Sequence, residues 1–104
     1  MKKALIICAG GMSSSLIAQK ATEQFEKQGE EIEVEATSAS ASSEIIEKDE
    51  YDLYMVSPQT KMHFNNINKV AEKYNKPVVN IPPQAYVPIP MGTEKMVELI
   101  LNNI

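Results

Sequence analysis

The strongest chemical signal in the sequence is a single cysteine followed by two glycines and three serines. Residues 8–15 read Cys-Ala-Gly-Gly-Met-Ser-Ser-Ser, between an apolar run and a helical pattern. At such a junction a thiol faces the N-terminus of a helix, where backbone N–H groups and the helix dipole stabilise an anion. Because the thiolate is the reactive form of cysteine, this position predicts that Cys8 is a nucleophile.

The residues after Cys8 are suited to holding a tetrahedral oxyanion. Glycines allow the backbone to approach a phosphate closely, and serine hydroxyls add neutral hydrogen-bond donors. The alternative is that Cys8 is a small buried hydrophobic residue, as free cysteines usually are. Its place before a glycine- and serine-rich helix start favours the anion site, with these predicted phosphate-binding residues: Ala9, Gly10, Gly11, Met12, Ser13, Ser14 and Ser15.

The chain contains no arginine, which narrows the possible chemistry. All ten basic residues are lysine, the acidic residues number 14, and the net charge of −4 argues against a nucleic-acid partner. Cysteine phosphate loops in low-molecular-weight tyrosine phosphatases and related arsenate reductases have an arginine six positions after the cysteine, where this chain has Ser14. Without a guanidinium, efficient ester hydrolysis is not expected. The loop is better suited to holding a phosphoryl group on sulfur and passing it on.

Other polar residues give weaker signals. Gln59 either reaches the phosphate loop or belongs to an ordinary strand-to-loop transition, and Tyr86 either lines a rim for partner docking or caps the core. We interpret His63 as a solvated residue near a helix start. A single cysteine excludes an internal disulfide and a cysteine zinc cluster, and the glutamates of 30–35 are too regularly spaced to converge. We therefore expect no metal and no cofactor.

Four strand–helix units are expected to position these residues. Residues 4–8 form a continuous apolar run, typical of a central parallel strand, whereas 31–36 alternate as an edge strand does. Right-handed crossovers then give an α/β fold, a single four-stranded parallel sheet of flavodoxin-like order 2-1-3-4 with helices on both faces. Ligands bind beyond the carboxyl ends of such strands, where the loops 8–15, 57–62 and 82–92 converge. The remaining expected strands are 53–56 and 78–81, and the expected helices are 13–27, 44–48, 65–74 and one from about Thr93.

Apolar residues at helical spacing predict which helix faces are buried. Residues 37–43 are expected to form a loop, with Ser42 or Ser43 capping the following short helix. The predicted apolar stripes are Leu16, Ile17, Ala21 and Phe25 in the first long helix, Ile67, Val70, Ala71 and Tyr74 in the third helix, and Met96, Val97, Ile100, Leu101 and Ile104 in the last.

The length and hydropathy pattern predict one domain over residues 1–104. The longest apolar run covers six residues, Ala4–Ala9, far fewer than the roughly 20 that a membrane-spanning helix needs. A cytoplasmic location is the default expectation for such a chain.

The sequence resembles a known family at several motifs. They are Leu-Ile-Ile-Cys-Ala-Gly-Gly-Met-Ser-Ser-Ser-Leu at 5–16, Ser-Pro-Gln at 57–59, and Ile81-Pro82 with Tyr86 and Gly92 before the last helix. The chain is similar to the B component, enzyme IIB, of the lactose/cellobiose/chitobiose class of the bacterial phosphoenolpyruvate-dependent sugar phosphotransferase system. The resemblance spans essentially the whole chain.

The resemblance implies a phosphocarrier function. Cys8 would accept a phosphoryl group from a phosphohistidine on enzyme IIA and deliver it to a sugar held by the membrane component IIC, with the loop Ala9–Ser15 around the phosphate. Such transfer depends on positioning and electrostatics and needs no cofactor. The alternatives are a flavodoxin-like, non-catalytic ligand-binding module and a cysteine phosphatase that lacks its arginine. The sequence does not name the sugar.

Overall fold

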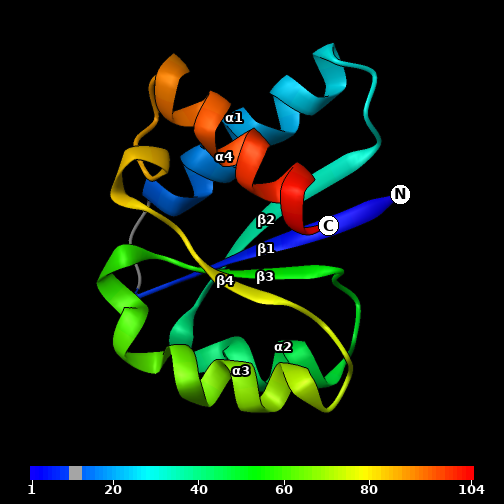
Figure 1. The fold of residues 1–104 in the computed structure, drawn as a ribbon, viewed down its shortest axis with the longest axis vertical. Coiled ribbons are helices and arrows are strands. Elements are labelled where there is room, and N and C mark those ends of the chain that lie inside the picture. The colour runs from blue at the N-terminus through cyan, green and yellow to red at the C-terminus, as the bar shows by residue number, and fades with distance from the viewer. Residues whose placement is uncertain (10–12) are drawn as a thin grey trace.

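The computed structural model describes residues 1–9 and 13–104 and shows an alternating α/β architecture (Figure 1). Short 3₁₀ helices precede α2, α3 and α4. In chain order the elements are β1 (Lys2–Cys8), α1 (Ser13–Lys27), β2 (Ile32–Ser38), η1 (Ala39–Ala41), α2 (Ser42–Glu47), β3 (Leu53–Val56), η2 (Pro58–His63), α3 (Phe64–Glu72), β4 (Val78–Asn80), η3 (Pro83–Ala85) and α4 (Pro90–Asn103).

The four strands form one parallel sheet in the order β2-β1-β3-β4, as the sequence predicts. β1 pairs with β2 on one side, where Cys8 lies opposite Ser38, and with β3 on the other, where Ile7 lies opposite Val56. Residues 4–8 of β1 are buried, because this strand has a neighbour on each side and helices over both faces. The continuous apolar run therefore does correspond to a central strand.

The helices cover the two faces of the sheet in pairs (Figure 1). α1 and α4 pack on one face around Ile6, Phe25 and Met96, and α2 and α3 pack on the other face around Leu5, Ile46 and Ile67. Alternate residues of β1 point to opposite faces, so each contributes to one of two separate hydrophobic clusters. This arrangement gives the sheet helices on both faces, as expected.

Two predicted core positions are wrong. Leu16 is 42% exposed and Leu101 is 44% exposed, although both lie on predicted apolar stripes. Ile17, Ala21 and Ile100 of the same helices are buried, so the buried face of each helix is narrower than its predicted apolar stripe. The last helix also begins at Pro90 rather than near Thr93, because proline is well suited to the first turn of a helix.

The segment predicted as a loop at 37–43 is more regular than expected. Thr37 and Ser38 extend β2, because the backbone there continues its pairing with β1, and 39–41 form η1. Neither Ser42 nor Ser43 is the N-cap of α2: that position belongs to Ala41, and the Ser42 hydroxyl donates to the Ala39 carbonyl oxygen at 2.7 Å. α3 ends at Glu72, two residues earlier than predicted, and its residues Ile67 and Ala71 are buried as expected.

The segments that follow β1, β3 and β4 leave the sheet at the same edge (Figure 1). The two chain termini lie toward the opposite edge. None of the helices in residues 1–9 and 13–104 combines the length and apolar character needed to cross a membrane. Because α/β proteins bind ligands beyond the carboxyl ends of their strands, the candidate functional site lies at the edge where these segments leave the sheet.

Candidate functional site

Cys8 is the last residue of β1 and is held in place by the central position of that strand. Its side chain is buried, with 5% exposed, and its thiol is free. Five residues beyond it, Ser13 begins α1, a helix of 15 residues. The sulfur therefore lies between the end of a rigid central strand and the start of a long helix, as the sequence predicts.

Among the described residues, two oxygen atoms lie within hydrogen-bond distance of the Cys8 sulfur. The hydroxyl oxygen of Ser14 is 3.0 Å from Sγ, and the carbonyl oxygen of Thr37 is 3.4 Å from it. Either atom of the Cys8–Ser14 contact can be the donor; when the thiol hydrogen is directed to the Thr37 carbonyl oxygen, which only accepts, the Ser14 hydroxyl is the donor to sulfur. The Ser14 hydroxyl can keep this role when the sulfur loses its proton and becomes a better acceptor.

The contact with Thr37 was not anticipated from the sequence. It arises because β2 is the neighbour of β1 and continues to Ser38, which lies opposite Cys8. Every residue has a backbone carbonyl, so the residue types do not indicate which carbonyl contacts Cys8. The one signal in the sequence was the alternating pattern of 31–36, which predicts the strand but not its last two residues.

The structure brings part of the predicted phosphate loop to Cys8. Ser14 is buried, with 3% exposed, whereas Ala9 and Ser15 are exposed at the surface. Ser13 is the first residue of α1. The predictions for Gly10, Gly11 and Met12 lie outside the described residues.

The weaker candidates fall into different environments. Gln59 is an exposed residue of η2, and His63 is exposed at the N-cap position of α3, as predicted for a solvated histidine. Tyr86 is half-buried and packs against the cluster beneath α1 and α4. This packing supports the interpretation of Tyr86 as a cap on the core; no contact of Gln59 with Cys8 is found among the described residues.

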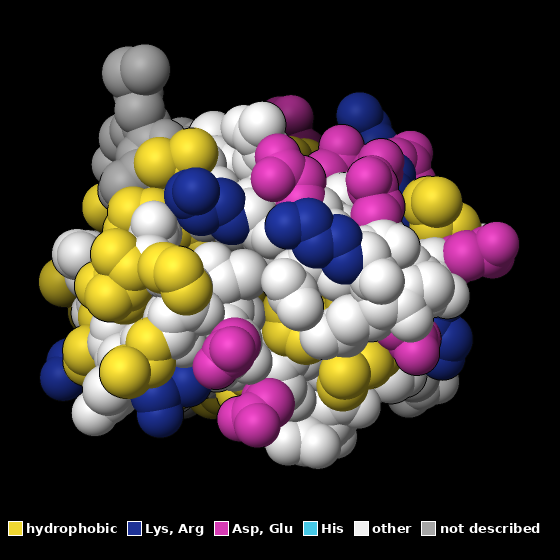
Figure 2. All heavy atoms as spheres, turned by 90° about the horizontal axis from the view of Figure 1, so that it is seen from above, with side chains coloured by type: hydrophobic (Ala, Val, Ile, Leu, Met, Phe, Trp, Pro, Cys, Tyr) yellow, Lys and Arg dark blue, Asp and Glu magenta, His cyan; other side chains and the backbone are white. Residues whose placement is uncertain are grey.

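Several apolar side chains are exposed in the segments at the carboxyl ends of the strands and in the first turns of α1 and α4. Leu16, Val87, Ile89 and Met91 are all at least 36% exposed. Segments 8–15, 39–43, 57–63 and 81–92 contain no aspartate or glutamate, while Lys61 lies in η2. Figure 2 shows hydrophobic side chains gathered at one end of the α1 and α4 face and acidic ones toward the other. An anion at Cys8 thus meets no nearby carboxylate from these segments.

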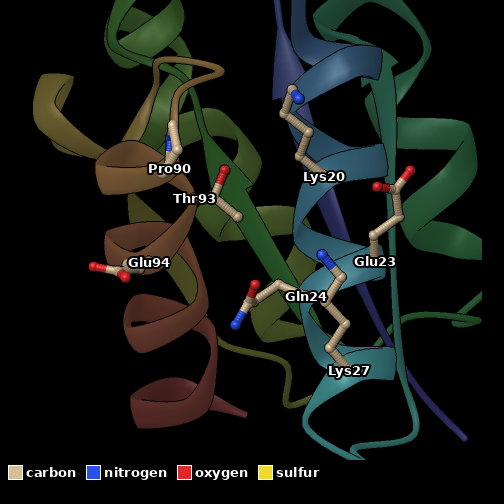
Figure 3. Close-up of a pocket in the computed structure, with 7 residues that line it drawn as sticks. All are labelled: Lys20, Glu23, Gln24, Lys27, Pro90, Thr93 and Glu94. Carbon is tan, nitrogen blue, oxygen red and sulfur yellow. The ribbon is translucent and has the colours of Figure 1, made fainter.

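A groove of about 240 Å³ between α1 and α4 is a less suitable site (Figure 3). In it Gln24 and Thr93 point into the space between the helices, while Glu23 and Glu94 point away from it. The lining mixes both charges, and its one hydroxyl, that of Thr93, donates to the Ile89 carbonyl oxygen at 3.2 Å. Cys8 therefore stays the candidate functional residue among those that the structure describes.

The fold and the site define a flavodoxin-like α/β protein with a cysteine at the carboxyl end of its first strand. A family model described as "PTS system, Lactose/Cellobiose specific IIB subunit" matches residues 3–99. The chain is also 35% identical, over 86 residues covering 83% of it and 82% of the relative, to the oligo-beta-mannoside-specific EIIB component of the PTS system of Bacillus subtilis (strain 168). This chain therefore belongs to the lactose/cellobiose-specific IIB subunit family of the phosphotransferase system.

Two solved structures have the same fold. The lactose-specific IIB domain from Streptococcus pneumoniae matches with a TM-score of 0.84 at 20% identity, over 98% of this chain and 96% of that one. The cellobiose-specific IIB component from Borrelia burgdorferi matches with a TM-score of 0.73 at 22% identity, over 98% and 90% of the two chains. The chain is thus a sugar-specific IIB component of a phosphotransferase system by family, and the sheet order is that of its structural relatives.

Proposed function

We propose that this chain is a phosphocarrier in which Cys8 accepts a phosphoryl group from the phosphohistidine of enzyme IIA and transfers it to a sugar held by the membrane component IIC. The observation that carries the proposal is the position of the Cys8 sulfur, at the end of β1, 3.0 Å from the Ser14 hydroxyl and just before α1. A thiolate and then a phosphoryl dianion are both stabilised by donors at a helix N-terminus. Family membership supports the same chemistry.

In the first step the Cys8 sulfur attacks the phosphorus atom, the P–N bond to histidine breaks and an S–P bond forms. The thiol proton passes to the imidazole nitrogen that carried phosphorus, so neutral imidazole is the leaving group, and no oxidant or reductant is involved. In the second step a sugar hydroxyl attacks phosphorus, the S–P bond breaks, and the thiol is regenerated. Both steps rest on positioning and charge stabilisation rather than on a cofactor.

The loop Ala9–Ser15 has the role of binding the phosphoryl oxygens. The phosphorylated sulfur gains up to about two negative charges, which backbone N–H groups and hydroxyl donors can offset. Ser14 is the described residue best placed for this, because its hydroxyl already contacts the sulfur. Because segments 8–15, 39–43, 57–63 and 81–92 contain no acidic residues, none of their side chains repels the negatively charged phosphoryl group.

The partners are proposed to dock at the same edge of the sheet. The exposed side chains of Leu16, Val87, Ile89 and Met91 offer an apolar surface next to the site, which suits contact with another protein. Because the donor and the acceptor are both delivered by other proteins, a shallow site suffices. Sugar selection is then a property of IIC.

A reconstituted transfer assay tests this proposal. IIA carrying a radioactive phosphoryl group is mixed with the chain and with vesicles containing IIC of the same system, and lactose, cellobiose and an oligo-β-mannoside are added in turn. We expect labelled sugar phosphate with at least one sugar when all components are present, and none with Cys8→Ser. Equal transfer with Cys8→Ser, or no transfer with the cognate IIA and IIC, would reject the phosphocarrier function.

A further inference from the structure

Two buried hydroxyl groups lie behind Cys8, where β3 ends and η2 begins. Ser57 is 0% exposed and Thr60 is 1% exposed, and their hydroxyl oxygens are 2.8 Å apart. Buried hydroxyls usually serve a hydrogen-bonding role, since leaving one unpaired is costly. The function proposed above uses neither of these side chains.

Both residues converge on the carbonyl oxygen of Ile7. The backbone N–H of Ser57 donates to it at 2.9 Å, and the Thr60 hydroxyl donates to it at 3.1 Å. The Thr60 hydroxyl also lies 3.1 Å from the Ser57 carbonyl oxygen, and the Thr60 N–H donates to that same carbonyl at 3.0 Å. All of these groups are satisfied when Ser57 donates its hydroxyl hydrogen to Thr60 and Thr60 donates its own to the carbonyls.

The Ile7 carbonyl belongs to the peptide group whose nitrogen is that of Cys8. A peptide group is planar, so two donors that hold the carbonyl oxygen also fix the nitrogen and the direction in which the Cys8 Cα leaves the strand. Only two rotatable bonds, N–Cα and Cα–Cβ of Cys8, separate this peptide group from the sulfur. The Thr60 side chain, 53 residues from Ile7 in the chain, thereby helps to fix the backbone atoms that carry the Cys8 side chain.

We propose that Thr60, supported by Ser57, is a positioning residue for phosphoryl transfer at Cys8. This inference rests on the proposed function, since it assigns no group that touches the phosphoryl itself. Transfer between heavy atoms is sensitive to small displacements of the attacking atom. The Thr60 hydroxyl is thus expected to affect the rate of transfer more than the affinity for the donor protein.

The test compares Thr60→Val, which keeps the shape and removes the hydroxyl, with Thr60→Ser, which keeps the hydroxyl. Phosphoryl transfer from phosphorylated IIA is followed in single-turnover experiments over a range of IIA concentrations. For Thr60→Val we expect the maximum rate to fall by about tenfold to a hundredfold with an unchanged half-saturating concentration. Thr60→Ser is expected to restore the rate to within about threefold of the unsubstituted chain.

Thr22→Val is the matched control. The Thr22 hydroxyl donates to the Ala18 carbonyl oxygen at 3.0 Å and accepts the Val34 N–H at 2.9 Å, so it also joins helix and sheet, but without contact to the Ile7–Cys8 peptide. We expect this variant to lose stability and to keep the maximum rate. Ser57→Ala keeps the Thr60–Ile7 contact, so its maximum rate is expected to lie between those of Thr60→Val and Thr22→Val. This variant provides a readout if Thr60→Val does not fold.

A spectroscopic measurement adds a readout that needs no partner. The amide ¹⁵N resonance of Cys8 should shift in Thr60→Val, return toward its original position in Thr60→Ser, and stay unchanged in Thr22→Val. An unchanged maximum rate of transfer to Cys8 in Thr60→Val, or an equal loss of rate in Thr22→Val, would overturn the positioning role alone. Absence of label on Cys8 in the unsubstituted chain would overturn the phosphocarrier function and the positioning role together.

Discussion

The sulfur of Cys8 and the hydroxyl oxygen of Ser14 lie 3.0 Å apart although they belong to different elements, the end of β1 and the first turn of α1. The contact joins the strand that fixes the cysteine to the helix whose N-terminus favours an anion. When the thiol hydrogen is directed to the Thr37 carbonyl oxygen, or when the thiol is deprotonated, the serine hydroxyl is the donor to sulfur. In the proposed function, Ser14 is the described residue whose side chain contacts the reacting sulfur.

Ser14→Ala should therefore slow phosphoryl acceptance without abolishing it. A hydrogen bond to a charged group contributes roughly 1.5–3 kcal/mol, which corresponds to about tenfold to a hundredfold in rate if the bond is stronger in the transition state. The measurement is the single-turnover rate of transfer from phosphorylated IIA, at saturating IIA. Ser43→Ala is the control, because Ser43 is an exposed serine of α2. Equal rates for both variants would contradict the assigned role.

A second cluster, at the amino-terminal side of the sheet, governs stability rather than transfer. The Tyr51 hydroxyl donates to the Glu35 carboxylate at 2.6 Å, and the Lys3 ammonium lies 3.3 Å from the same carboxylate oxygen and 4.8 Å from the centre of the Tyr51 ring. The hydrogen bond from Tyr51, followed by Lys3, holds the pKa of Glu35 below its usual 4.5 despite partial burial. Burial and the bond to Glu35 together raise the pKa of Tyr51 well above its usual range.

Tyr51→Phe should lower the free energy of unfolding by about 1 kcal/mol at neutral pH, a modest effect because the Glu35 side chain is 43% exposed. A lowered carboxyl pKa stabilises the fold above the unfolded pKa near 4.5, and this contribution is lost as the pH falls through the lower folded pKa. The stability difference between the two proteins should thus shrink between about pH 5 and pH 3, as measured by urea unfolding. A difference that stays constant or grows on acidification would contradict this account, and phosphorylation of Cys8 should be unchanged.

Gly92 in α4 makes room for the loop that precedes this helix. A Cβ atom on Gly92 would overlap the carbonyl oxygen of Val87. Since that neighbour is backbone, Gly92→Ala must displace the segment that carries the exposed residues Val87 and Ile89. We expect a loss of about 1–3 kcal/mol in the free energy of unfolding, as for other overpacked positions. Gly29→Ala is not a suitable comparison because its φ of 77° adds strain, so Ser43→Ala serves again.

If the docking proposal is correct, Gly92→Ala should also weaken the interaction with IIA, because it moves the apolar surface next to the site. The dissociation constant, from isothermal titration calorimetry, should rise for Gly92→Ala and stay the same for Ser43→Ala. Unchanged stability of Gly92→Ala would show that the Val87 segment moves freely. Unchanged affinity with reduced stability would remove this loop from the docking surface.

The order of the sheet and the central place of Cys8 were predictable because the burial of a strand determines its pattern of apolar residues. The uninterrupted run at Ala4–Cys8 and the alternation at 31–36 separate a central strand from an edge strand. The helix start at Ser13 was also predictable, from the glycines before it and the apolar spacing after it. Family resemblance led to the same fold, and the family match over residues 3–99 confirms it.

Contacts made by backbone groups were not predictable. The Thr37 carbonyl reaches Cys8 because β2 extends through residues that read as a loop, and the Ile7 carbonyl is held by Thr60 across the sheet. Residue types carry no information on where a carbonyl points. The predicted burial of Leu16 and Leu101 was wrong for a related reason. Apolar periodicity indicates which face of a helix is buried but not how wide the buried face is.

The most direct test of the central claim is intact-mass analysis of the chain after incubation with phosphoenolpyruvate, a phosphotransferase-competent bacterial extract and the cognate IIA. Cys8→Ser and His63→Ala are analysed beside it, the latter because His63 is the one histidine of the sequence and is exposed. The account predicts a gain of one phosphoryl group in the unsubstituted chain and in His63→Ala, and no gain in Cys8→Ser, whose circular dichroism spectrum stays the same. A phosphoryl group retained in Cys8→Ser, or lost in His63→Ala, would contradict Cys8 as the acceptor.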